Sequence, residues 1–153
     1  MENEKTIEVL NSLVTINNDR VEGYETAIGE TQEQDLKDLF AQLARTSQKC
    51  KQELVNEVTR LGGKPTEGTK ASGKIYRIWM EFKSAVTGKD RKAILASCEF
   101  GEDAAVDTYF KVLENQKEDI TAEQQAMIRN QYNLIKADHD KIKRLRDELI
   151  ELN

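Results

Sequence analysis

Apolar residues recur every three or four positions along almost the whole chain, and this spacing places them on one face of an α-helix. The pattern predicts four long helices, over about residues 3–28, 32–61, 90–118 and 122–151, and a shorter helix over about 73–86. No strand is expected, and a chain of 153 residues with a single proline does not suit a turn-rich β fold. The sequence therefore predicts an all-α fold.

The ends of the expected helices coincide with residues that commonly stop or start helices. Glycine and proline are expected to end the first two helices, at Gly29 and at Gly62, Gly63 and Pro65. Capping side chains are expected to start the second, third and fourth long helices, and these are the pair Thr31–Gln34, the residue Asp90 and the pair Thr121–Gln124.

The lengths of the connections decide how the helices pack. About three residues join the first helix to the second, and the third long helix to the fourth, so each pair must form an antiparallel hairpin. About 27 residues, from 63 to 89, separate the hairpins, and this is enough chain to return along the bundle. Two hairpins with one long crossover have the ferritin-like topology. We therefore predict one ferritin-like four-helix-bundle domain over residues 1–153, in which the crossover helix covers a seam and buries Trp79.

Charge and composition exclude several classes of partner. The formal net charge is −5, which gives a nucleic-acid or anionic-membrane partner no electrostatic support. The first residues are acidic and polar and no long apolar run follows, so neither a secretory signal nor a membrane span is expected. Cys50 and Cys98 are far apart in sequence and lack a Cys-x-x-Cys motif. They are expected to be free thiols that pack in the core of a cytoplasmic protein.

The centre of a ferritin-like bundle is the place where a metal pair would bind. Such a site needs a Glu from each of two helices and a Glu-x-x-His from each of the others. No Glu-x-x-His occurs in this chain, which has one histidine. The residues expected near the centre are Asn17, Ser47 and Cys50, then Glu102 with Glu99 beside it, and Asp138 with His139 beside it. Nucleophile triads, phosphate-binding glycine loops and zinc-type clusters are absent from the sequence, so no catalytic residue is assigned.

Glu102 and His139 are expected at the same height in the second hairpin. Glu102 lies 18 residues before residue 120 and His139 lies 19 residues after it, which predicts a contact between their side chains. One interpretation is a reduced metal site with Glu102, His139 and Glu99 as ligands. The other is a buried polar pair that fixes the register of the helices. We favour the pair, because two ligands from neighbouring helices do not make a di-iron site.

The stretch from Ala71 to Leu113 is the most distinctive part of the chain. Its motifs are Arg77-x-Trp79, Thr87-Gly88-x-Asp90 and Cys98-Glu99-x-Gly101-Glu102-Asp103, and His139-Asp140 follows in the last helix. On these motifs, about residues 8–148 resemble an uncharacterised bacterial family of ferritin-like four-helix-bundle proteins, catalogued as a domain of unknown function. Two departures from the pattern of that family, Tyr76 in place of a common His and Ser97 in place of a common acid, each remove a potential ligand.

The first helix is also similar to bacterioferritin over the run LNSLVTIN and at Tyr24. This similarity implies that Asn17 stands where that family has a ligand Glu. The resemblances together imply a ferritin-like fold with no established activity, and relatives of similar shape are associated with stress responses.

The function expected from these observations is a structural or binding role for a non-catalytic helical bundle that has no cofactor and forms a homodimer. The alternative is a metal-binding protein, an iron or manganese oxidase or store with a reduced site. A carrier that holds a small molecule in the bundle core is a third interpretation.

Overall fold

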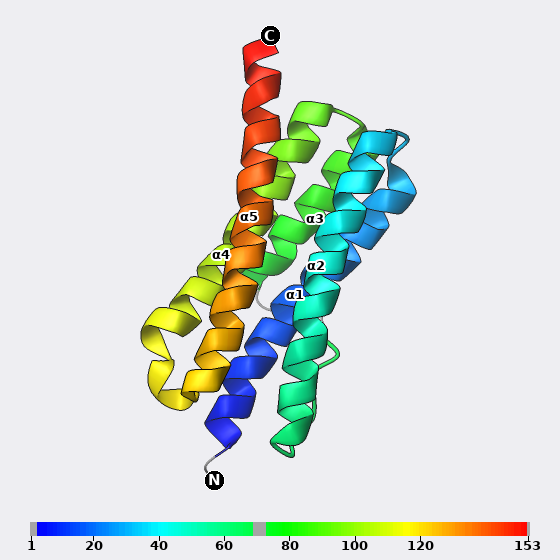
Figure 1. The fold of residues 1–153 in the computed structure, drawn as a ribbon. Coiled ribbons are helices and arrows are strands. Elements are labelled where there is room, and N and C mark those ends of the chain that lie inside the picture. Colours follow the sequence, from blue (N-terminus) through cyan, green and yellow to red (C-terminus); the bar gives the residue numbers. More distant parts are fainter. Residues whose placement is uncertain (1–2, 69–72, 153) are drawn as a thin grey trace.

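The computed structural model describes residues 3–68 and 73–152, which form five α-helices and one 3-10 turn (Figure 1). The helices are α1 (Glu4–Glu30), α2 (Gln34–Arg60), α3 (Gly73–Gly88), α4 (Arg91–Asn115) and α5 (Ala122–Leu152), and the turn is Lys117–Asp119. No strand occurs in these described residues, so the predicted all-α class is confirmed.

Two antiparallel hairpins build the molecule (Figure 1). α1 packs along α2, and α4 packs along α5. The hairpins face each other, because α1 also contacts α4 and α2 also contacts α5. α2 and α4 start at the same end, where Arg91 of α4 pairs with Asp35 of α2 (Nη2–Oδ2, 2.5 Å). The chain therefore returns along the length of the bundle between α2 and α4.

α3 lies in this returning segment and packs against α4 and α1. Its anchor is Trp79, which is 5% exposed, so the predicted burial of this side chain is confirmed. The indole ring lies between Gly23 of α1 and Gly101 of α4. A Cβ added at these glycines would lie 2.5 and 3.0 Å from the nearest ring carbons. The two glycines thus let α3 approach the bundle closely.

Three of the predicted helix ends are confirmed. Thr121 and Gln124 form a reciprocal capping box, in which the backbone N of Thr121 donates to Gln124 Oε1 (2.9 Å) and the backbone N of Gln124 donates to Thr121 Oγ1 (3.1 Å). Asp90 caps α4 by accepting from the backbone N of Lys92 (3.1 Å). Gly62 follows α2 with φ of +84°, the left-handed conformation that glycine adopts without strain.

Two predicted ends are wrong. α1 continues through Gly29 to Glu30, because the backbone there stays helical until Thr31, which is extended (ψ 146°). Thr31 and Gln34 form no capping box, since α2 begins later than predicted and Glu33 is its N-cap residue. The hydroxyl of Thr31 instead accepts from the backbone N of Glu33 (3.2 Å).

The third long helix was predicted to reach about residue 118, but α4 ends at Asn115. Gln116 leaves the helical conformation (φ −125°), and the 3-10 turn follows. The buried side chain of Ile120 then joins the core before α5 starts. The second hairpin therefore has a longer connection than the first.

The buried apolar side chains form two clusters. One contains Leu13 of α1 and Leu54 of α2, together with Tyr109 of α4. The other contains Tyr24 and Phe40 of the first hairpin, together with Trp79 and Phe82 of α3. In every long helix the sequence passes from one cluster to the other through buried polar residues.

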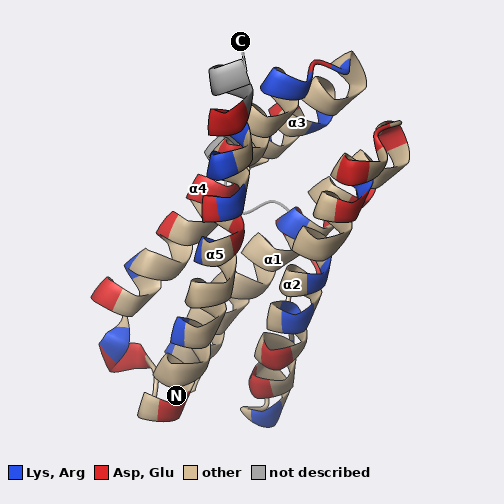
Figure 2. Ribbon diagram, turned by 45° about the horizontal axis from the view of Figure 1, so that its top comes forward, with Lys and Arg blue, Asp and Glu red and all other residues tan. Residues whose placement is uncertain are grey.

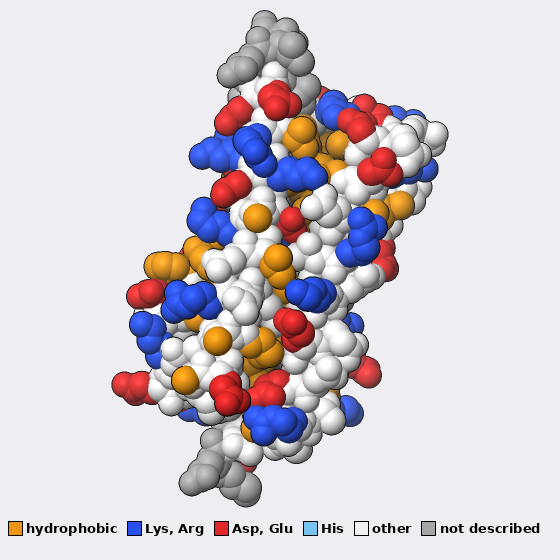
Figure 3. Space-filling view, viewed as in Figure 1, with side chains coloured by type: hydrophobic (Ala, Val, Ile, Leu, Met, Phe, Trp, Pro, Cys, Tyr) orange, Lys and Arg blue, Asp and Glu red, His pale blue; other side chains and the backbone are white. Residues whose placement is uncertain are grey.

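Charged side chains of both signs are interspersed along the outside of the helices (Figure 2; one face is shown in Figure 3). Among the residues whose side chains are described, the large hydrophobic ones that remain exposed are Tyr76, Met80, Phe100, Phe110 and Leu134. None of the described helices combines the length and the apolar character that a membrane crossing requires.

Candidate functional site

A layer of buried polar side chains separates the two apolar clusters, and each long helix contributes one member. These are Arg20 of α1, Ser47 of α2, Glu102 of α4 and Asp138 of α5. Arg20, Ser47 and Glu102 are completely buried, and Asp138 is 6% exposed. Because polar groups are expensive to bury without partners, the contacts within this layer decide what it can do.

The guanidinium of Arg20 joins the other three side chains. It forms a bidentate pair with Glu102, with Nε donating to Oε2 (2.8 Å) and Nη2 donating to Oε1 (2.6 Å). Nη1 donates to Ser47 Oγ (2.6 Å), and Nη2 also reaches Asp138 Oδ2 (3.4 Å). Such planar, two-point pairing of Arg with a carboxylate is among the strongest polar contacts in proteins.

The electrostatics of the layer follow from its burial. Burial by itself would lower the pKa of Arg20, but the charge and hydrogen bonds of Glu102 outweigh it, and the net shift is upward. Burial raises the pKa of Asp138, while the charge of Arg20 opposes that shift. The guanidinium carbon also lies 5.6 Å from the ring centre of Tyr24, a cation–π distance. Arg20 therefore stays charged at the centre of the bundle.

This set of donors does not fit a pair of metal ions. A dinuclear centre in a four-helix bundle needs carboxylates and imidazoles pointing inward from all four helices. Here a cationic side chain already lies among the carboxylates, and both oxygens of Glu102 accept hydrogen bonds from it. The α2 member is a serine hydroxyl, which is not among the usual ligands of such a centre. The layer is chemically complete as an ion-pair network.

A second buried polar chain lies next to this layer, on the side of the Leu13 cluster. Asn17 Nδ2 donates to the hydroxyl of Tyr109 (2.8 Å), and that hydroxyl donates to Gln131 Oε1 (2.7 Å). Gln131 Nε2 continues to the carbonyl oxygen of Cys50 (3.3 Å) and to Glu53 Oε1 (3.0 Å). All four long helices are again linked, so the two chains together fix how the helices are aligned.

The predicted contact between Glu102 and His139 is wrong. Glu102 and His139 lie at similar heights along the hairpin, and Glu102 points into the bundle. On α5, however, the side chain that points inward is that of Asp138, the residue before His139. His139 lies at the edge of the α4–α5 pair, where its Nε2 contacts Asp103 Oδ1 (2.5 Å). The rise per residue of an α-helix predicts how far along the helix a residue lies, but it does not predict the direction in which the side chain points.

Arg20 is the residue that the sequence reasoning missed. A signal was available, because Arg20 stands four residues from both Ile16 and Tyr24, on the same buried stripe of α1. A charged residue on an apolar stripe indicates a buried partner of opposite charge.

Glu99, Asp103 and His139 form a separate cluster at the surface between α4 and α5. One potential ligand atom from each lies within 4.8 Å of the other two. Glu99 Oε2 accepts from Arg146, and His139 Nδ1 contacts Asp140 Oδ1 (3.2 Å). The hydrogen bond with His139, and then the charge of Lys136, lower the pKa of Asp140. The structure thus brings Glu99 and His139 together, and it places Glu102 elsewhere.

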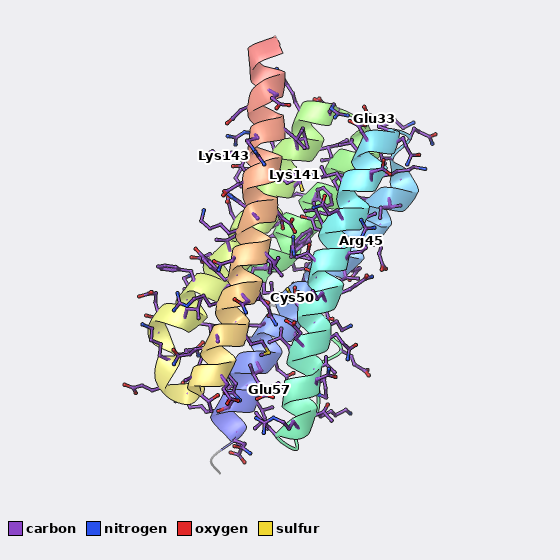
Figure 4. The ribbon with its side chains drawn as sticks, viewed as in Figure 1. Glu33, Arg45, Cys50, Glu57, Lys141 and Lys143 are labelled. Atoms are coloured by element: carbon purple, nitrogen blue, oxygen red, sulfur yellow. The ribbon has the colours of Figure 1, made fainter. Side chains whose placement is uncertain are left out.

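Cys50 and Cys98 are free and buried, in agreement with the prediction. Cys50 is on α2 at mid-height of the bundle (Figure 4), and burial raises the pKa of its thiol to about 11. Burial raises the pKa of Cys98 as well, and its sulfur lies 3.5 Å from the hydroxyl of Tyr24. Thiols in such surroundings are mostly protonated at neutral pH and react poorly.

A groove of about 580 Å³ runs between α3 and α4. Its apolar side chains include Ile75 and Ile78 of α3 and Phe100 of α4, and its rim carries Asp107 and Lys111. The groove is open to solvent and lies outside the buried polar layer.

The family described as a domain of unknown function (DUF2383) matches residues 5–115 of the chain. The match extends from α1 to the end of α4, so it includes Arg20, Ser47 and Glu102 but ends before Asp138 and His139. No curated protein matches the chain.

Proposed function

The chain belongs to the DUF2383 family, and from that membership we propose that it is a ferritin-like bundle with a structural or binding role and no catalytic centre. The order of the helices supports the ferritin-like part of this proposal. α1 and α2 form one hairpin, α4 and α5 form the other, and a long connection containing α3 joins them. This is the arrangement of ferritin-like folds with one long crossover.

The observation that carries the proposal is the position of Arg20. Its guanidinium lies at the centre of the bundle, among side chains from α2, α4 and α5. A fixed positive charge repels a metal cation at short distance and engages the carboxylate of Glu102 that a metal would need. The layer therefore supports alignment of the helices rather than oxidation or storage of a metal.

The alternative function, an iron or manganese oxidase or store, would require Glu102 to release Arg20. The released guanidinium would remain buried without its main partner, at a cost of several kcal/mol. This cost favours the structural or binding role.

Metal loading tests the proposal. Protein purified without chelators is incubated with Fe(II) or Mn(II) and desalted, and bound metal and oxygen consumption are measured for wild type, Glu102→Gln and His139→Gln. We expect no oxygen consumption above that of buffer, and no retained metal that depends on Glu102. Retention of one or two equivalents by wild type and His139→Gln, with loss in Glu102→Gln, would overturn the proposal.

We also propose that the protein forms a homodimer. The support is the exposure of large apolar side chains on the adjacent helices α3 and α4, with Met80 45% and Phe100 61% exposed. Phe100 lines the apolar groove between α3 and α4 together with Ile75 and Ile78, whereas Met80 lies on the side of α3 that faces Asp19 and Glu22 of α1. Large exposed apolar groups are common where subunits meet.

A further inference from the structure

We propose that Glu99, Asp103 and His139 bind one divalent transition-metal ion of the Zn²⁺ type at the surface between α4 and α5. The two acids are four residues apart on α4, so they lie on one face of that helix. The histidine comes from α5 and faces them. The ion would thus join the two helices of the second hairpin.

The geometry shows that the three side chains already converge on one place. Potential ligand atoms from all three lie within 4.8 Å of one another. His139 Nε2 and Asp103 Oδ1 are 2.5 Å apart and form a hydrogen bond with each other, which an ion between them would replace. Zn²⁺ binds His nitrogen and carboxylate oxygen at about 2.0–2.2 Å, so small side-chain rotations bring all three donors into range.

The surroundings hold the ligands in place. Asp140 engages the other ring nitrogen of His139 (Nδ1–Oδ1, 3.2 Å), which is the second contact that metal-binding histidines usually make. Glu99 is only 9% exposed, and Arg146 engages its Oε2, which leaves Oε1 for an ion. One nearly buried acid and one oriented imidazole distinguish this cluster from a group of loose surface acids.

The donor set selects the class of metal. One imidazole nitrogen with two carboxylate oxygens suits Zn²⁺ and its neighbours, whereas Ca²⁺ and Mg²⁺ prefer oxygen ligands alone. Among common divalent ions, Zn²⁺ binds such sites more tightly than Mn²⁺. Three protein ligands leave a fourth position for water. We therefore expect one Zn²⁺ per chain, with Mn²⁺ binding more weakly.

This site is distinct from the centre of the bundle, because Glu102 and Arg20 do not take part in it. It goes beyond the proposed function and does not depend on it. The metal-loading test above turns on Glu102, whereas the test of the surface site turns on His139 and Asp103.

The test is competition for Zn²⁺ between the protein and a chromophoric chelator. Wild type is compared with His139→Gln and Asp103→Asn, and with Asp107→Asn as a matched control. Asp107 is also an exposed acid on α4, one turn from Asp103, but it pairs with Lys111 (2.9 Å) and lies outside the cluster. Circular dichroism checks that each variant is folded.

We expect wild type and Asp107→Asn to bind one Zn²⁺ with the same affinity. His139→Gln and Asp103→Asn should each lose at least about tenfold in affinity, and Asp140→Asn, which changes the contact to His139 Nδ1 but removes no ligand, should lose about 10–100-fold. No Zn²⁺ binding by wild type, or equal binding by wild type and His139→Gln, would overturn the proposal.

A second measurement identifies the ligands directly. Co²⁺ in place of Zn²⁺ gives visible absorption bands that depend on the number of ligands and on the presence of nitrogen. We expect these bands in wild type and Asp107→Asn, and their loss in His139→Gln. The spectrum of hydrated Co²⁺ in wild type would contradict the assignment of the ligands.

Discussion

Arg20 is a fully buried cation, and its effect on stability depends on the partner that neutralises it. Taking both charges of an ion pair out of water is costly, and good geometry repays the cost only in part. The bidentate contact with Glu102 and the hydrogen bond to Ser47 satisfy most of the guanidinium donors. Arg20 and Glu102 should therefore behave as a unit, in which loss of one member harms the other.

Arg20→Met should lower the free energy of unfolding by about 3–5 kcal/mol, because it leaves Glu102 buried and unpaired. The double variant Arg20→Met with Glu102→Leu should be much less destabilised than the sum of the two single variants. Urea denaturation of the four proteins gives this double-mutant cycle. Additive losses would contradict the coupling.

Glu57 should make stability depend on pH in the acid range. It accepts from Arg60 (Nη2–Oε2, 2.6 Å) and from Gln124 of α5 (2.7 Å), near the lower end of α2 in Figure 4. The hydrogen bond from Arg60, and then that from Gln124, lower the pKa of Glu57 from 4.5 to about 2. A lowered folded pKa means that the stabilisation is present above about pH 4.5 and is lost as the pH falls through about 2.

Glu57→Gln should therefore be less stable than wild type at pH 6, and the difference should vanish as the pH approaches 2. The difference should be about 1 kcal/mol or less, because the side chain of Arg60 is 64% exposed and its charge is screened by water. Urea denaturation at several pH values measures it, with the exposed Glu114→Gln as control. A difference that does not change with pH would contradict the argument.

At the scale of the helices, the approach of α3 to α1 depends on the absence of a side chain at Gly23. Gly23→Ala would place a Cβ 2.5 Å from the ring of Trp79, so the ring or the helix must shift. Overpacking of this kind costs about 1–3 kcal/mol, partly offset by the better helix propensity of Ala.

Gly29→Ala is the matched control on the same helix, because nothing lies within 4 Å of its added Cβ. It should raise the free energy of unfolding by about 0.5–1 kcal/mol, since Ala favours the helix over Gly. Thermal melts of the two variants should shift in opposite directions. A higher melting temperature for Gly23→Ala would show that Trp79 yields easily.

The helices themselves could be predicted from the sequence, whereas some of their ends could not. Periodic apolar residues report burial of one face over many positions, and this signal does not depend on any single residue. The end of α1 depends on the backbone angles of a few residues, and Gly29 keeps helical angles because Thr31, not Gly29, provides the turn. The partner of Glu102 depends on the direction of one side chain, which height along the helix does not give.

At the scale of the whole molecule, we expect light scattering to give about twice the chain mass of 17.5 kDa at tens of micromolar. Phe100→Glu should shift the mass toward that of a monomer, because it places a charge in the apolar groove that Phe100 lines with Ile75 and Ile78. Leu134→Glu, a similar change at an exposed apolar residue of α5, should leave the mass unchanged. A monomeric wild type would end the proposal of a homodimer.

The arrangement of two hairpins could be inferred from the lengths of the connections, because links as short as residues 31–33 and 116–121 leave neighbouring helices antiparallel. The division of the core into two clusters could not be inferred in the same way. It depends on four polar residues from four helices, and their contacts become visible only when α1, α2, α4 and α5 are packed together.

The guanidinium at the centre has a consequence for how the protein is made. In a bundle whose inner carboxylates bind metal ions, the negative charge at the centre is balanced only after those ions have bound. Without the ions, the carboxylates repel one another. In this chain the balancing cation is synthesised with the polypeptide, as Arg20 itself. The charge of Glu102 is therefore balanced as soon as α1 and α4 pack together, by a group that belongs to the same chain.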